Sequence, residues 1–181
     1  MVNEGKNFEA LFKSSSPIYL KIVRLPDPPQ SFTQRSDTRF SKKNPYDYEC
    51  YDSLHRISYS LELKTTSQKY LTYHTCEKDE KEKKSANISW HQIEGLTKAS
   101  EYDACIAGFM FNFRLDNGEQ ILYFMNIKDF NRYRLNTNKK SLNILDISLN
   151  GGVKICGEKL RKNYRWNLDE FFKSQSKVYP L

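Results

Sequence analysis

Residues 46–64 contain two carboxylates and one ammonium group at a spacing that could bring them together. Asp47 lies in a short run of aromatic and β-branched residues, and Glu62 and Lys64 lie in a second such run, with turn formers between them. Two runs of this kind, so close together, predict an antiparallel hairpin. A turn centred between Leu54 and His55 pairs residue i with residue 109 − i, which sets Asp47 opposite Glu62.

This register brings the three charged side chains to one patch. Directly opposed residues of a hairpin have Cβ atoms roughly 4.5–5.5 Å apart, and Glu62 and Lys64 share a face because strand side chains alternate. Two carboxylates repel each other at that distance, so the pair favours a divalent cation between them. Glu49 shares the face of Asp47 and is an alternative ligand. The segment therefore predicts a cation site beside a lysine.

Asp47 and the run Glu62-Leu63-Lys64 resemble the PD-(D/E)XK nuclease superfamily, with Tyr46 where the nominal proline would stand. Other motifs surround them in a fixed order. The complete series resembles RecU-type Holliday junction resolvases over roughly residues 4–130. The additional motifs are Gly5 to Glu9, Arg24-Leu25-Pro26-Asp27-Pro28-Pro29-Gln30, and His91-Gln92-Ile93-Glu94.

The resemblance implies the fold class and the catalytic set. It implies an α/β, restriction-endonuclease-like mixed β-sheet flanked by helices, as a single domain over residues 1–181. Phosphodiester hydrolysis needs an activated water and charge compensation, which Mg²⁺ or Mn²⁺ supplies. The expected metal ligands are the Asp47 and Glu62 carboxylates and the Leu63 carbonyl. The expected catalytic residues are Glu9, Asp47, Glu62, Lys64 and Gln92.

For three of these residues the sequence is compatible with more than one role. Lys64 could orient or deprotonate the attacking water, or stabilise the pentavalent phosphate. Glu9 would lie outside the metal ligands or bind through water; alternatively, it is a glutamate favoured by the helix dipole. Gln92 would hydrogen-bond near Lys64 or the nucleophile, or it serves only as the capping-box partner of Ser89.

Cations on the route into the hairpin predict contacts with DNA phosphates, which depend on charge and not on sequence. The alternative is a solvated basic loop. The chain departs from the RecU-type pattern in two places. It has a shortened basic stalk or loop at 31–45 and a charged insertion at about 72–84. The run 77–84 has four acids and four bases, which favours a solvated or disordered loop. The predicted DNA contacts are Arg24, Arg35, Arg39, Lys42 and Lys43.

Composition limits the class of protein and its partners. The 181 residues carry a net charge of +7, which favours a polyanionic partner. No apolar run approaches the ~20 residues of a membrane span, and the start does not resemble a signal peptide. We therefore expect a cytoplasmic protein with no membrane contact. Four scattered cysteines predict neither a zinc site nor disulfides, and no motif indicates an organic cofactor.

The remaining pattern predicts helices and strands around the hairpin. A capping box at Ser89 begins one of the helices. The expected helices are about 4–13, 89–99, 127–133 and 166–172, the last capped by Asn167 or its neighbour. The expected strands outside the hairpin are 18–24, 104–113 and 120–125, with a further hairpin of 143–148 and 153–156.

Three functions are compatible with this sequence. The leading hypothesis is a metal-dependent, structure-selective endonuclease that resolves four-way junctions of branched double-stranded DNA in recombination and repair. Two equivalent cuts need two sites related by a twofold axis, so this hypothesis implies a homodimer. The alternatives are a PD-(D/E)XK endonuclease acting on duplex, flap or specific-site DNA, and a junction-binding module that does not cleave.

Overall fold

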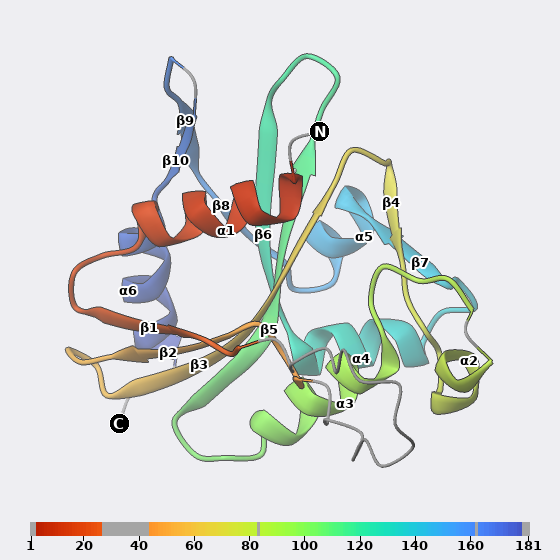
Figure 1. Ribbon diagram of the computed structural model, residues 1–181. Coiled ribbons are helices and arrows are strands. Elements are labelled where there is room, and N and C mark those ends of the chain that lie inside the picture. The colour runs from red at the N-terminus through yellow and green to blue at the C-terminus, as the bar shows by residue number, and fades with distance from the viewer. Residues whose placement is uncertain (1–2, 27–43, 83, 162, 179–181) are drawn as a thin grey trace, which may run out of the picture.

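A six-stranded mixed sheet forms the centre of the protein, in the order β1-β2-β3-β5-β6-β8 (Figure 1). The computed structural model describes residues 3–26, 44–82, 84–161 and 163–178. β3 and β5 run parallel, and the other neighbouring pairs of this sheet run antiparallel. The sheet strands are β1 (Leu20–Arg24), β2 (Tyr48–Asp52), β3 (Ile57–Thr66), β5 (Cys105–Arg114), β6 (Gln120–Asn126) and β8 (Val153–Ile155).

Helices and two small ladders surround this sheet. One ladder pairs β4 (Tyr70–Thr72) with β7 (Ser141–Asn143), and the other pairs β9 (Gly157–Lys159) with β10 (Tyr164–Trp166). The helices are α1 (Glu4–Ser15), α2 (Glu77–Lys81), α3 (Trp90–Ala99), α4 (Ile127–Leu135), α5 (Ile144–Leu149) and α6 (Leu168–Val178). The predicted class, a mixed sheet flanked by helices, is confirmed.

The two faces of the sheet carry separate apolar cores. On one face α1 and α6 pack through residues such as Phe12 and Phe172 onto β2, β3 and β5. On the other, α3 and α4 pack through residues such as Leu96 and Phe130 onto β5 and β6. β5 is buried along most of its length because it supplies side chains to both cores, as expected for a central strand next to a parallel neighbour.

The β2–β3 hairpin has the predicted register. Tyr48 faces Leu61 and Asp52 faces Ile57, so paired positions sum to 109. The fully buried Asp52 carboxylate accepts the backbone N–H groups of Leu54 and His55 at 2.9 and 3.0 Å. An aspartate that binds the backbone two or three residues on fixes the turn, and the turn fixes the register of both strands.

The region from 143 to 148 does not form the predicted strand. Asn143 instead caps α5, because its side chain accepts the Asp146 N–H while the Asp146 carboxylate accepts the Asn143 N–H. This reciprocal pair begins a helix and buries Ile147. β8 therefore pairs with β6 and not with this segment. The terminal helix also begins later than predicted, at Leu168, with Asn167 accepting the Glu170 N–H.

In the charged tract at 72–84, the run 77–84 begins as a helix and so is not the expected loop, whereas most of its described side chains are exposed to solvent as expected. α2 lies in this tract, and its charges pair one turn apart, Lys81 with Glu77 at 2.8 Å. Asp79 is buried and binds Thr75 and Lys84. Pairs of opposite charge four residues apart stabilise a short helix.

No helix in the described ranges is long and apolar enough to cross a bilayer.

Candidate functional site

Asp47 directly precedes β2 and stays beside β3. Its N–H donates to the Leu61 carbonyl at 3.2 Å, and its Oδ2 accepts the Leu63 N–H at 2.9 Å. The paired register of β2 and β3 ends at Tyr48 and Leu61, and Asp47 bonds to the two residues that flank Glu62. The Asp47 carboxylate is close enough to raise the pKa of Glu62, so the two carboxylates converge although Asp47 is not a ladder partner of Glu62.

Glu62 is the most buried charged group of the site, with 2% of its surface exposed. Its Oε1 accepts Lys64 Nζ at 2.9 Å and Gln92 Nε2 at 2.5 Å. Its Oε2 is buried without a hydrogen-bond partner among the described residues. A buried unpaired carboxylate oxygen is costly, and a bound water, a bound ion or a catalytic role would account for it.

The pKa values of both carboxyls are raised. Burial raises the pKa of Glu62 from 4.5 to about 7; the Asp47 carboxylate adds to the rise, and the Lys64 ammonium opposes it. Burial also raises the pKa of Asp47, against the Leu63 N–H and Lys64, with Glu9 adding to the rise. Asp47 thus disfavours the charge of Glu62, and Glu9 disfavours the charge of Asp47. A cation between Asp47 and Glu62 would relieve both.

Glu9 reaches the same site from α1. Its Oε2 accepts Arg24 Nε at 2.8 Å and the Tyr48 hydroxyl at 2.7 Å. The Tyr48 ring is fully buried, and burial together with this hydrogen bond raises the pKa of its hydroxyl, which stays a neutral donor. Sequence reasoning missed Tyr48. Its position next to Asp47, on the opposite strand face, was the available signal.

Gln92 makes a hydrogen bond with each end of its side-chain amide. Its Oε1 accepts the Ser89 N–H at 3.0 Å, as in a capping box, while its Nε2 donates to Glu62. Because the cap fixes the amide, the N–H₂ group is aimed at the carboxylate. The start of α3 thus orients Glu62.

α3 also fixes the approach to Asp47. Gly95 packs against Pro45, and a Cβ at Gly95 would lie 2.4 Å from Pro45 Cβ, far inside contact distance. Only glycine permits this close passage. One helix therefore holds both arms of the site, Glu62 through Gln92 and Asp47 through Gly95.

The predicted DNA contacts divide into two groups. Arg24 binds Glu9 and is part of the site, with a third of its side chain exposed. The other four, Arg35, Arg39, Lys42 and Lys43, lie outside the described residues. The described ends on either side of them meet at the site: Asn44 Nδ2 donates to the Pro26 carbonyl at 2.6 Å, and the Leu25 N–H donates to the Asp47 carbonyl at 2.9 Å.

A second network links the charged tract to α3, which the sequence did not indicate. Glu80 of α2 accepts the His91 backbone N–H at 2.9 Å and lies 2.7 Å from His91 Nδ1. The Trp90 N–H donates to the buried His74 Nδ1 at 3.3 Å. These contacts satisfy N–H groups at the start of α3 and so support the turn that carries Gln92.

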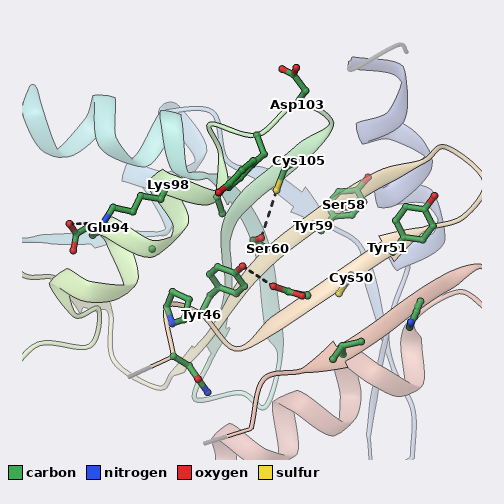
Figure 2. Close-up of a pocket in the computed structure, with 18 of the residues that line it drawn as sticks. Tyr46, Cys50, Tyr51, Ser58, Tyr59, Ser60, Glu94, Lys98, Asp103 and Cys105 are labelled. Atoms are coloured by element: carbon green, nitrogen blue, oxygen red, sulfur yellow. Dashed lines mark hydrogen bonds and ion pairs between the residues drawn. The ribbon is translucent and has the colours of Figure 1, made fainter. Parts of the chain in front are cut away.

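A groove of about 1070 Å³ lies on the α3 side of β1, β2 and β3 (Figure 2). Pro45 and Tyr46 line it, and the Tyr46 hydroxyl donates to Glu49 at 3.0 Å. Glu49 therefore faces the groove, and neither Glu62 nor Lys64 lines it. Burial raises the pKa of the lining Cys50 to about 12, which keeps this thiol protonated and unreactive.

The oxygen atoms of the site decide whether it can hold a cation. Across the described parts of the chain, no three His, Cys, Asp or Glu side chains gather closely enough to hold a metal by themselves. The set that fits has two carboxylates, with the unpaired Glu62 Oε2 among their oxygens. Oxygen donors of this kind suit Mg²⁺ or Mn²⁺, which complete their shells with water.

Sequence comparison identifies a relative of nearly the full length. The SPbeta prophage-derived uncharacterized protein YotM of Bacillus subtilis (strain 168) is 30% identical over 197 residues, which covers 99% of this chain and 92% of YotM. The chain belongs to the YotM family. No family model matches it.

Comparison with solved structures finds the Holliday junction resolvase Hjc of Archaeoglobus fulgidus. The match covers 83% of this chain and 92% of that chain, with 13% sequence identity and a TM-score of 0.44. A likeness at this level carries no inference about substrate or mechanism. The RecU-type resemblance stays a prediction.

Proposed function

We propose that this chain is a metal-dependent DNA endonuclease whose active site comprises Asp47, Glu62 and Lys64. One observation carries the proposal: a nearly fully buried glutamate with an unpaired oxygen lies beside a second carboxylate and a lysine. A buried ion pair is favourable only when further hydrogen bonds satisfy its remaining lone pairs, which is not the case for Glu62 Oε2 among the described residues. The net charge of +7 supports a polyanionic substrate.

Three donors would hold a divalent cation. The carboxylates of Asp47 and Glu62 supply two of them. The Leu63 carbonyl is the third, because the N–H and C=O of a strand residue point to the same side, and the Leu63 N–H points at Asp47. When bound, the cation would lower the pKa of a coordinated water and neutralise charge on the phosphate.

The remaining residues prepare this site. Gln92 fixes the Glu62 carboxylate, and Lys64 places an ammonium group beside it that can orient the attacking water or stabilise the phosphate. Glu9, held by Tyr48 and Arg24, adds a third negative charge whose field reaches Asp47. Arg24 and the cations of residues 35–43 would bind phosphates on either side of the cut.

Within this proposal, the substrate is a four-way DNA junction and the active form is a homodimer, because two symmetric nicks need two sites related by a twofold axis. Both points rest on the motif order in the sequence. Duplex, flap or specific-site DNA is the alternative substrate.

A cleavage assay tests the proposal. A labelled immobile junction and a linear duplex of matched sequence are incubated with Mg²⁺, Mn²⁺ or EDTA, using wild type and Asp47→Asn. We expect symmetric nicks on the junction that need the metal, and no cutting but near wild-type binding by the variant. Cutting of the duplex would select the alternative substrate. Tight junction binding without cutting in either metal would reject the nuclease.

A further inference from the structure

Two lysines flank Glu9 on one side of α1. Lys6, Glu9 and Lys13 are spaced i, i+3 and i+7, which places them along one stripe of a helix. The opposite stripe, including Phe8 and Phe12, is buried against the sheet. Lys6 and Lys13 are both exposed.

Lys13 contacts Tyr48, the residue that donates to Glu9. Its Nζ lies 5.5 Å from the centroid of the Tyr48 ring, and the hydroxyl of that ring donates to Glu9. The Tyr48 ring therefore links the Lys13 ammonium group to the Glu9–Arg24 pair. Lys6 lies on the other side of Glu9, one turn towards the N-terminus.

The charges of these two lysines are not neutralised. No ion pair of the described residues involves Lys6 or Lys13, whereas each described lysine of α2 and α3 lies within 4 Å of a carboxylate. Free ammonium groups release counterions when they bind phosphate and so contribute fully to affinity for nucleic acid.

The groove that Pro45 and Tyr46 line has a different balance of charge. Three carboxylates line it, from Glu49, Glu94 and Asp103, against two ammonium groups, from Lys21 and Lys98. Lys98 already pairs with Glu94 at 3.1 Å. The charged side chains of this lining carry no net positive charge, so the groove attracts a polyanion less than the two lysines of α1 do.

We propose that Lys6 and Lys13 bind phosphates of the DNA strand that enters the site, and that DNA approaches from the α1 side and not through the groove. Seven residues of helix span about 10 Å, and phosphates follow one another by about 3.4 Å along the duplex axis of one strand. The two ammonium groups therefore reach phosphates on both sides of the one nearest Glu9. The inference rests on the proposed function for the identity of the strand.

A matched pair of double variants tests this placement. K6Q/K13Q removes two exposed charges from α1, and K21Q/K98Q removes two exposed charges from the groove, so the change in net charge is the same. Binding to a fluorescent four-way junction and to a duplex is followed by anisotropy in EDTA, over a series of salt concentrations. K6Q alone is included because Lys6 does not stack on Tyr48. Thermal unfolding checks that all variants are folded.

We expect K6Q/K13Q to bind roughly tenfold more weakly and to lower the slope of log K against log salt by about 2, with K6Q accounting for about half of that slope. K21Q/K98Q should stay within about twofold of wild type. Equal losses in the two double variants, or an unchanged slope in K6Q/K13Q, would overturn the inference. A wild type that binds DNA in this pattern but never cuts it would reject the nuclease and leave the inference standing.

Discussion

The carboxylate cluster and the groove are neighbours along the segment from Pro45 to Asp47, and they differ in burial, pairing and charge. The groove has a volume of about 1070 Å³, but its glutamates are exposed and have partners, Tyr46 for Glu49 and Lys98 for Glu94. The cluster holds a buried carboxylate with an unpaired oxygen and a pKa raised to about 7. The candidate site is therefore identified by its buried carboxylate with a raised pKa and not by the size of a cavity.

The same comparison shows how α3 serves both regions. Its exposed side, with Glu94 and Lys98, walls the groove, while Gln92 and Gly95 hold the two arms of the cluster. Substitutions on the two sides of one helix should therefore have very different effects.

The largest expected difference is between substitution of the buried Glu62 in the cluster and substitution of the exposed Glu49 in the groove. Glu62→Gln should lower the rate of metal-dependent DNA cleavage by roughly 10³-fold or more, because it removes a charged metal ligand. Glu49→Gln removes a groove glutamate from the neighbouring strand and should retain wild-type cleavage. Single-turnover rates with Mg²⁺ measure both variants. Equal loss in both would mean that the groove belongs to the active site.

A smaller effect is expected from the packing of α3 on Pro45. Gly95→Ala places a methyl group where Pro45 lies, so the segment carrying Asp47 must move. Displacements of this size cost roughly 10- to 100-fold in rate. Gly5→Ala is the matched control, because its Cβ would meet its nearest neighbour at 3.4 Å, an ordinary contact. Circular dichroism should show both variants folded, and wild-type activity in Gly95→Ala would refute the positioning role.

The raised pKa of Glu62 predicts that metal affinity depends on pH. Below pH 7 the cation must displace a proton from Glu62, and above pH 7 it does not. The apparent affinity for Mn²⁺, measured by calorimetry, should be about tenfold weaker at pH 6 than at pH 8. Glu62→Gln should lose this difference along with most of the affinity. Equal wild-type affinities at the two pH values would contradict the assignment.

The smallest effect concerns stability without metal. The pKa of Glu62 is about 7 in the folded chain and 4.5 when unperturbed, so the folded state loses stability as the pH rises from 4.5 to 7. In EDTA, Glu62→Gln should therefore raise the Tm by a few degrees at pH 8 and by less at pH 5. A Tm increase that is the same at both pH values would show that ionisation of Glu62 is not its cause.

Local patterns in the sequence sufficed for the hairpin and for one helix start. The turn residues around Leu54 and His55 fixed the register, because strand pairing follows directly from the turn. The Ser89–Gln92 spacing predicted the start of α3 for the same reason: a cap involves neighbours in sequence. The strand predicted at 143–148 was wrong although the Asn143–Asp146 capping pair was visible in the sequence. The apolar residues of this segment fit both the helical and the strand period.

Long-range contacts were beyond the sequence. Nothing local indicates that Tyr48 donates to Glu9, that Glu80 of the charged tract binds His91, or that Gly95 makes room for Pro45. Each joins residues 11 to 50 positions apart, whose meeting depends on how helices pack on the sheet. The sequence determined which groups are carried to the site, because alternation along two strands is a local property. Only the tertiary structure decided that Glu62 is buried with an unpaired oxygen, since burial depends on every element packed around it.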